Sequence, residues 1–308
     1  MAAGHRRNIF FLFHLAQTAH SAGVKLSSGE IRRAVSAALQ EDVGSGDATT
    51  LATVPRGLKA VAQMNAREKL VLAGLDFAET AFKLLSRSVK VRRFHRDGDR
   101  VRAGEPLLRV EGPARALLTA ERVALNFAQR LSGIATASAA HVDAVAGTGV
   151  VILDTRKTAP GLRLLDKYAV SCGGGQNHRM DLADGVLIKN NHISLGGGVA
   201  KVLALAMQRR PPGQKIQIEV RSLSELDEAI AGGADSLLLD NMTPAETTRA
   251  VVVARKHVPD IPIEVSGGIT LETVRKYAQT GVTYISVGAL THSVMAIDLS
   301  MKITAEIF

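Results

Sequence analysis

The sequence contains one cysteine, Cys172, in 308 residues. A single cysteine excludes an internal disulfide bond and any zinc site built from cysteine ligands. The residue lies beside glycines and a few positions before His178, which would suit a nucleophile. No separate histidine–asparagine pairing accompanies it, so we interpret Cys172 as a small core or loop residue.

Aromatic residues are also scarce, with 8 Phe, 3 Tyr and no Trp. The formal net charge of +9 favours anionic partners, and nucleic acid is the generic candidate. Nucleic-acid-binding chains interleave stacking aromatics with basic residues or carry a recognisable module, and this sequence has neither. We therefore predict a small polyanionic substrate and no nucleic-acid partner.

No stretch approaches the roughly 20 consecutive apolar residues of a transmembrane helix. Near the N-terminus, Arg6 and Arg7 precede an apolar run over 9–13, but His14 interrupts it before it reaches the length of a signal peptide's hydrophobic region. We interpret residues 1–25 as an N-terminal extension, and we expect a cytoplasmic protein without a membrane partner.

The second half of the chain alternates between two periodic patterns. Short apolar runs typical of buried strands are separated by helical patterns such as 224–231, 244–257 and 271–280. The strand-like runs are 150–153, 185–188, 216–220, 236–239, 261–265 and 284–287. This alternation predicts an α/β fold with a parallel sheet, which we expect to form a barrel.

The first half is expected to contain strands and helices of its own. A helical pattern over 31–39 can be capped by Ser27 or Ser28. Further on, Thr119-Ala120-Glu121 is predicted to open a long helix, which places Arg122 in the first turn. Because the helix dipole disfavours a cation there, we expect Arg122 to have an anionic partner.

Charged residues stand where the predicted strands of the second half end. In α/β barrels the chemistry lies at the carboxyl ends of the strands. Those ends carry Arg156, Lys157, Lys189, Glu219 and Asp240, and Lys167 adds a further cation nearby. The two carboxylates could bind sugar hydroxyls or a divalent cation, or they could form a structural ion-pair network with the lysines.

Glycine-rich turns add a second signal. Gly173–Gly175 should let the backbone approach a ligand closely, and His178 and Arg179 follow at once. The turns Ser266-Gly267-Gly268 and Gly288-Ala289 follow the last two predicted strands, where barrels often hold a phosphate with backbone N–H groups. Together these features predict a phosphorylated sugar with further anionic groups as the ligand.

Five ordered motifs resemble those of the quinolinate phosphoribosyltransferase family, whose members are also called carboxylating nicotinate-nucleotide pyrophosphorylases. They are D-T-R-K-T at 154–158, G-G-G-x-N-H-R at 173–179, L-I-K-x-N-H at 187–192, L-L-D-N-M at 238–242 and S-G-G-I at 266–269. The similarity extends from about Ile31 to the C-terminus.

The resemblance implies conversion of quinolinate and phosphoribosyl pyrophosphate into nicotinate mononucleotide, pyrophosphate and CO2, with Mg²⁺, in de novo NAD biosynthesis. It also implies an α/β sandwich domain, over 26–127 plus about 290–308, joined to an incomplete, open, TIM-like α/β barrel over 128–289. Family members form homodimers, and Arg122 would be donated across the interface into the neighbouring subunit's site.

The same resemblance implies roles for individual residues. The clamp on the two quinolinate carboxylates would consist of Arg156, His178, Arg179 and the partner subunit's Arg122. The charge of the departing pyrophosphate would be neutralised by Lys157 and Lys189. The ribose hydroxyls and Mg²⁺ would be bound by Glu219 and Asp240. The 5′-phosphate would be received by Ser266, Gly267, Gly268, Gly288 and Ala289.

Two positions depart from the family pattern, and alternatives remain open. Asn190 stands where the family usually has aspartate, and Arg221 stands where a further acid is common. The nearest alternative is a sibling phosphoribosyltransferase that uses another acceptor, such as nicotinate, or the homologue associated with molybdenum transport. A non-catalytic anion- or nucleotide-binding barrel is a second alternative, and nucleic-acid binding is the weakest.

Overall fold

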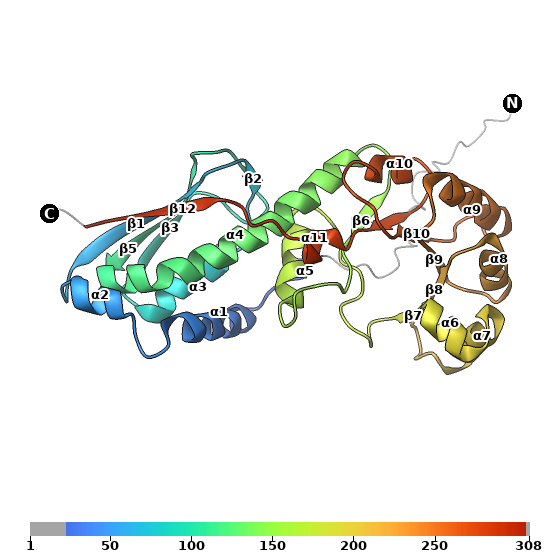
Figure 1. The fold of residues 1–308 in the computed structure, drawn as a ribbon, viewed down its shortest axis with the longest axis horizontal. Helices are drawn as coiled ribbons and strands as arrows, with labels where there is room; N and C mark the ends of the chain where they lie inside the picture. The colour runs from blue at the N-terminus through green and yellow to red at the C-terminus, as the bar shows by residue number, and fades with distance from the viewer. Residues whose placement is uncertain (1–22, 306–308) are drawn as a thin grey trace, which may run out of the picture.

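The computed structural model describes residues 23–305. The expected N-terminal extension over 1–25 therefore lies almost entirely outside the described residues. Figure 1 shows two lobes, one around an antiparallel sheet and one around a parallel sheet, with the helix α4 (Ala114–Ala144) extending from the first into the second. No helix of the described part is both long enough and apolar enough to span a membrane.

The first lobe contains a four-stranded sheet with helices against one face. In spatial order its strands are β12 (Leu299–Ala305), β1 (Lys59–Ala66), β5 (Pro106–Pro113) and β3 (Lys90–Arg93). The lobe also holds α1 (Ser28–Val43), α2 (Ala48–Thr53), α3 (Leu75–Leu85) and the short pair β2 (Leu70–Val71) and β4 (Arg100–Val101). Burial alternates along β1, where Ala60, Ala62 and Met64 enter the core, as the two-residue period of a strand requires.

The ends of the described chain meet in this lobe. β12 pairs antiparallel with β1, so residues near the C-terminus complete a sheet begun by residues near the N-terminus. At the start of α1, the hydroxyl of Ser27 accepts a hydrogen bond from Glu30 N–H (3.3 Å), and the Glu30 carboxylate accepts one from Ser27 N–H (2.8 Å). This capping box confirms the predicted cap.

The predicted start of the long helix was wrong. α4 begins at Ala114, directly after Pro113, and not at Thr119. The residues 114–118 are Ala, Arg, Ala, Leu and Leu, which are strong helix formers and extend the helix toward β5. Arg122 therefore lies well inside α4, and the argument from the helix dipole for an anionic partner does not apply to it.

The second lobe is an open parallel barrel of six strands. Their spatial order is β6 (Val151–Leu153), β11 (Tyr284–Ser286), β10 (Ile263–Ser266), β9 (Ser236–Asp240), β8 (Ile216–Val220) and β7 (Val186–Ile188). Every neighbouring pair is parallel. Within the described residues β6 and β7 do not pair with each other, which leaves the barrel open on that side and confirms the predicted fold class.

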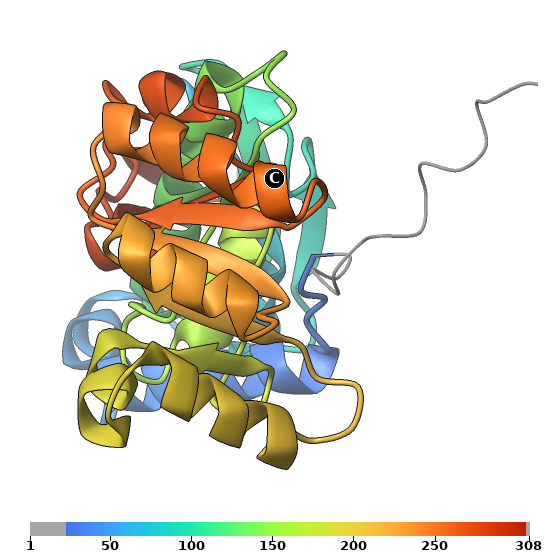
Figure 2. The same cartoon turned by 90° about the vertical axis from the view of Figure 1, so that its right-hand side faces the viewer.

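Helices cover the outside of this sheet. They are α5 (Arg163–Cys172), α6 (Asn190–Gly196), α7 (Val199–Arg209), α8 (Leu223–Ala231), α9 (Pro244–His257), α10 (Val274–Ala278) and α11 (Ala289–His292). Figure 2 shows α7, α8 and α9 stacked in front of the strands. The patterns over 224–231 and 244–257 correspond to α8 and α9, whereas the pattern over 271–280 yields only the shorter α10.

The glycine run after α5 packs against α4. A Cβ on Gly173 would lie 2.3 Å from the carbonyl oxygen of Ala135 and 2.6 Å from Cβ of Ser138, closer than atoms can approach. Gly174 has a positive φ of 85°. The close approach expected of this run is thus made to a helix, and it brings the turn that precedes His178 against the junction of the two lobes.

Candidate functional site

A pocket opens at the carboxyl ends of the barrel strands. Its lining residues are Thr155, Arg156, Lys157, His178, Arg179, Leu187, Lys189, Glu219, Leu238, Asp240, Glu264, Ser266 and Ser286. Every strand from β7 to β11 contributes at least one of them, as does the turn after β6. The predicted residues Arg156, Lys157, His178, Arg179, Lys189, Glu219, Asp240 and Ser266 are therefore brought together.

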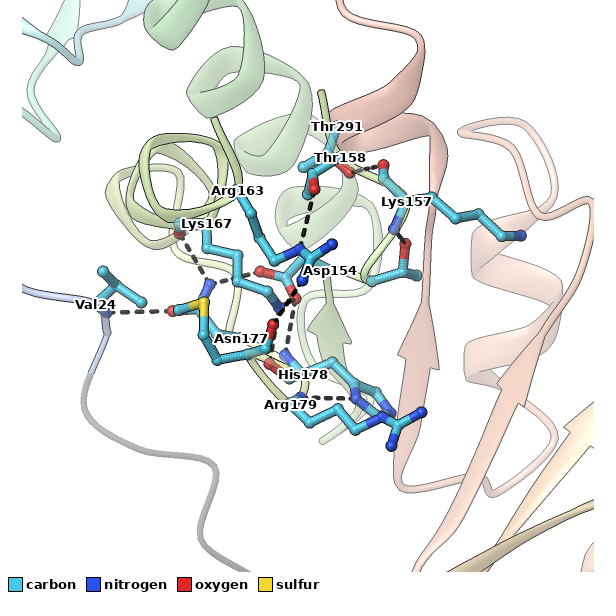
Figure 3. Close-up of polar contacts among 12 residues, drawn as sticks. Val24, Asp154, Lys157, Thr158, Arg163, Lys167, Asn177, His178, Arg179 and Thr291 are labelled. Carbon is cyan, nitrogen blue, oxygen red and sulfur yellow. Dashed lines mark hydrogen bonds and ion pairs between the residues drawn. The ribbon is translucent and has the colours of Figure 1, made fainter. Parts of the chain in front are cut away.

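A buried acid directly after β6 organises one wall. Asp154 is fully buried and accepts hydrogen bonds from Lys167 Nζ, from Asn177 Nδ2 (2.6 Å) and from the backbone N–H of His178 (2.8 Å). Figure 3 shows these partners converging on the Asp154 carboxylate from α5 and from the turn that follows it. Burial raises the pKa of Asp154 and lowers that of Lys167, which means that each charge depends on the other for stabilisation.

Lys167 does not line the pocket. Its side chain is fully buried, and Nζ donates to the carbonyl oxygen of His178 (2.8 Å) as well as to Asp154. The cation that the sequence placed in the same cluster as Arg156 therefore has a structural partner. Its effect on the site is indirect, because it fixes the backbone of the residue whose ring reaches the pocket.

His178 connects this wall to the barrel interior. Its Nδ1 accepts a hydrogen bond from the backbone N–H of Arg179 (2.7 Å), and its Nε2 lies 3.3 Å from a carboxylate oxygen of Glu264. Since Nδ1 is an acceptor in this arrangement, the ring proton sits on Nε2 and points toward Glu264. The imidazole thereby holds both the Arg179 backbone and the acid on β10.

Glu264 was missed at the sequence level. It is 2% exposed in the middle of β10, and its carboxylate also accepts from Gln217 Nε2 (2.8 Å) on β8. Burial alone raises the pKa of Glu264, but His178 and the hydrogen bonds to the carboxylate outweigh it and hold the pKa below its usual range. The available signal was a charged residue inside the otherwise apolar run 261–265.

The guanidinium groups of Arg156 and Arg179 face the pocket, and their positive charge is only partly offset by neighbouring residues. Burial lowers the pKa of Arg179, and the positive charge of Arg156 lowers it further. Arg179 Nη1 donates to the carbonyl oxygen of Gly185 (3.2 Å), whereas Arg156 Nε is buried and has no hydrogen-bond partner among residues 23–305. A buried donor beside a second cation is the arrangement that an anionic group would complete.

The two predicted carboxylates lie side by side. Asn190 Nδ2 donates to Glu219 Oε1 and to Asp240 Oδ2 (3.3 Å), and therefore bridges the side chains of β8 and β9. Burial raises the pKa of Glu219, and the charge of Asp240 raises it further, against the opposing effect of Lys189 and Arg221. The lysines make no ion pair with these acids in the described part, so a structural ion-pair network is not what holds the acids together.

The glycine turns lie beside the pocket, and only their serine lines it. Gly267 and Gly268 have φ values of 107° and 60°, and a Cβ on Gly267 would lie 2.2 Å from Asn241 Oδ1. A Cβ on Gly288 would lie 3.1 Å from the Lys157 side chain, so the second turn, with Ala289, adjoins that lysine. Both turns keep the backbone close to the pocket, while Gly267, Gly268, Gly288 and Ala289 do not form its lining.

Arg122 lies apart from this pocket. It is exposed on α4, and its side chain makes no hydrogen bond or ion pair with another residue in the range 23–305.

Cys172 ends α5 and is packed against the core. Burial, reinforced by the charge of Asp97, raises the pKa of the Cys172 thiol to about 12, in agreement with its interpretation as a packing residue.

Comparisons with known proteins agree over nearly the whole chain. Residues 47–132 match the profile described as "Quinolinate phosphoribosyl transferase, N-terminal domain", and residues 134–302 match that of the C-terminal domain. A protein of Mycobacterium leprae named "Nicotinate-nucleotide pyrophosphorylase [carboxylating]" is 45% identical over 275 residues, covering 88% of this chain and 96% of that one. The chloroplastic protein of the same name from Oryza sativa is 42% identical over 294 residues, covering 90% and 79%.

Among solved structures, the nicotinate-nucleotide pyrophosphorylase from Francisella tularensis superimposes with a TM-score of 0.87 at 38% identity. The match covers 92% of this chain and 100% of that one. The similarity therefore includes both lobes and the pocket between the strand ends.

Proposed function

The chain belongs to the quinolinate phosphoribosyltransferase family, and from that premise we propose how its residues transfer a phosphoribosyl group to quinolinate with loss of CO2. The reaction consumes phosphoribosyl pyrophosphate and yields nicotinate mononucleotide and pyrophosphate for NAD biosynthesis. The observation that carries the proposal is the pair Arg156 and Arg179, whose positive charges are only partly offset, with a buried Nε on Arg156 that lacks an acceptor among residues 23–305.

These arginines suit a dicarboxylate acceptor. A guanidinium presents parallel N–H donors that match the two oxygens of a carboxylate, and two such groups can hold two adjacent carboxylates on a pyridine ring. Arg156 and Arg179 take these positions, with His178 beside them. The network behind them, from Asp154 through His178 to Glu264, holds the clamp in place before the acceptor arrives.

The donor substrate occupies the opposite part of the pocket. Lys157 and Lys189 are unpaired cations in the described structure and would balance the charge of pyrophosphate as it departs. Ser266 and the turns at Gly267-Gly268 and Gly288-Ala289 lie at the ends of β10 and β11, and the second turn adjoins Lys157. Backbone N–H groups of these turns can hold the 5′-phosphate.

The acid pair fits Mg²⁺. Glu219 and Asp240 lie side by side and supply hard carboxylate oxygens, the donor type that Mg²⁺ prefers. We assign Glu219 and Asp240 to hold the ion and the ribose hydroxyls. When bound, Mg²⁺ would offset the charge of the pyrophosphate.

The chemistry then requires no nucleophilic side chain. The pyridine nitrogen attacks C1 of the ribose while the bond from C1 to pyrophosphate breaks, through a state with oxocarbenium character. Positioning by the arginines and charge stabilisation by the lysines lower this barrier. The positive ring nitrogen then stabilises the carbanion left when the 2-carboxylate departs as CO2, and a proton replaces the carboxylate.

Arg122 completes the proposal across a homodimer. Its exposed side chain, which has no partner among the described residues, is available to another subunit and would add a further positive charge beside the two carboxylates of the acceptor. This assigns the partner subunit's Arg122 to the clamp, so that the active unit is the dimer.

Product formation tests the proposal directly. The full chain is incubated with phosphoribosyl pyrophosphate and Mg²⁺, and quinolinate and nicotinate are offered in separate reactions. We expect nicotinate mononucleotide and CO2 from quinolinate alone. Turnover of nicotinate would make this a sibling enzyme, and saturable binding of phosphoribosyl pyrophosphate without turnover of either acid would favour a binding protein.

A variant tests the clamp itself. Arg156→Ala should abolish measurable quinolinate binding while leaving the fold intact, because it removes the buried donor that no described residue satisfies. Isothermal titration measures the binding and circular dichroism the fold. Unchanged affinity for quinolinate would move the clamp elsewhere.

A further inference from the structure

The side-chain amide of Asn190 joins the two acids, Glu219 and Asp240, that are assigned to hold Mg²⁺. Asn190 is the first residue of α6 and follows β7 by one residue, while its two acceptors stand on β8 and β9. A single Nδ2 group donates to Glu219 Oε1 and to Asp240 Oδ2 at 3.3 Å. Each of its two N–H bonds has a carboxylate acceptor, so the amide is fully used as a donor.

The bridge offsets a repulsion. Two carboxylates that share one donor are close enough to raise each other's energy, and half-burial of Glu219 reduces the screening by water. The cations Lys189 and Arg221 lower this energy from a distance, but neither forms an ion pair with Glu219 or Asp240 in the described part of the chain. The amide is the group in direct contact with both acids.

A divalent ion and the amide would compete for the same oxygens. An ion that bridges Glu219 Oε1 and Asp240 Oδ2 would displace the Asn190 N–H groups that these two oxygens now accept. The other end of the amide, Oδ1, is buried and has no hydrogen-bond partner within residues 23–305. The side chain therefore offers the acids a neutral substitute for a cation and adds no negative charge of its own.

We propose that Asn190 is a positioning residue that holds Glu219 and Asp240 together without a metal, and thereby lowers both the metal affinity of the site and its dependence on metal for structural order. The proposal rests on the assignment of these acids to Mg²⁺ under the proposed function. It makes the identity of residue 190 the determinant of how strongly this chain retains the ion.

Asn190→Asp is the informative variant. It removes the donor and places a third carboxylate beside the first two, with almost no change in volume. Without metal the variant should be less stable than the parent, and with metal the third anionic ligand should tighten binding at least roughly tenfold, since ligand charge sets the affinity of hard-cation sites. Asn190→Ala removes the donor without adding charge, so it should share the loss of stability and show little of the gain in affinity.

A matched control stands at the next position. Asn191 is exposed, and Asn191→Asp introduces the same charge one residue away without touching the bridge. The dissociation constant for Mn²⁺ is measured by electron paramagnetic resonance on the full chain without substrates. The melting temperature is measured by calorimetry in EDTA and in excess Mg²⁺.

The expected result is a lower melting temperature in EDTA for both variants at position 190, a larger recovery by Mg²⁺ for Asn190→Asp than for the parent, and tighter Mn²⁺ binding in that variant alone. Equal changes in Mn²⁺ affinity and in melting temperature for Asn190→Asp and Asn191→Asp would overturn the inference, because they would reflect net charge and not the hydrogen bonds of Asn190. Unchanged metal affinity in Asn190→Asp, with the parent still converting quinolinate, would overturn the inference and leave the proposed function standing. Mn²⁺ binding that Glu219→Gln leaves unaffected would refute both this inference and the metal assignment.

Discussion

Replacing Asp154 with asparagine should cost the protein about 3–5 kcal/mol of unfolding free energy, the loss typical when one partner of a buried ion pair is removed. Asp154 and Lys167 are both fully buried, and neutralising the acid leaves the ammonium group without a counter-charge. Asparagine preserves the shape of the side chain, so the loss comes from the missing charge and from one lost hydrogen-bond acceptor, and not from a cavity.

Hydrogen bonds around Asp154 that do not involve its carboxylate survive the substitution and reduce the loss of unfolding free energy. Lys167 Nζ keeps the carbonyl oxygen of His178 (2.8 Å), and Asn177 Nδ2 keeps the carbonyl oxygen of Lys167 (2.8 Å). These surviving bonds place the expected value toward the lower end of the range. Because a protein of this kind is stable by only about 5–15 kcal/mol, the change should still be plain in a denaturation midpoint.

The assay is urea unfolding of the parent, Asp154→Asn, Lys167→Met and the double variant. Each single change leaves one buried charge, whereas the double variant leaves none, so it should lose less than the sum of the two single variants. A loss below about 1 kcal/mol for Asp154→Asn, or strictly additive losses, would refute the view that this pair is a coupled buried unit.

Three further predictions concern separate parts of the molecule. Arg122→Ala should inactivate the enzyme. Dimers that combine one Arg122→Ala chain with one inactive Glu219→Ala chain should regain activity, because one of their two sites has both an intact pocket and an intact arginine from the partner. No recovery of activity would contradict donation of Arg122 across the interface. The lowered pKa of Glu264 stabilises the fold above the ordinary carboxyl pKa, and that stability should be lost as the pH falls through the lowered value. Glu264→Gln should flatten this acid limb in melting curves from about pH 3 to 7, and an unchanged limb would argue against the contact between Glu264 and His178. With its pKa raised to about 12, Cys172 should react far more slowly with iodoacetamide at pH 8 in the native protein than after denaturation, and equal rates would show an exposed thiolate.

The architecture was largely readable from local patterns. Runs such as 216–220 and 236–239 alternate with helical segments. A strand or an amphipathic helix can be predicted from a few residues because its side-chain period depends only on neighbours along the chain. Dependence on local patterns also explains the wrong start predicted for α4. Thr119-Ala120-Glu121 resembles a helix start, but the good helix formers begin earlier, at Ala114. This dependence also explains why Arg156, Lys189 and Asp240 were found, since each ends an apolar strand or stands within three residues of its end.

The sequence by itself determined which elements form and which charged residues stand at the strand ends, because both depend on neighbours along the chain. Only the tertiary structure decided which of those charges are used internally. Lys167 turns inward to Asp154, Glu264 on β10 contacts His178 in the turn after α5, and Asn190 joins acids that lie 29 and 50 residues further along. These contacts follow from strand order and from the need to satisfy buried polar groups across the barrel, and no local pattern carries that information.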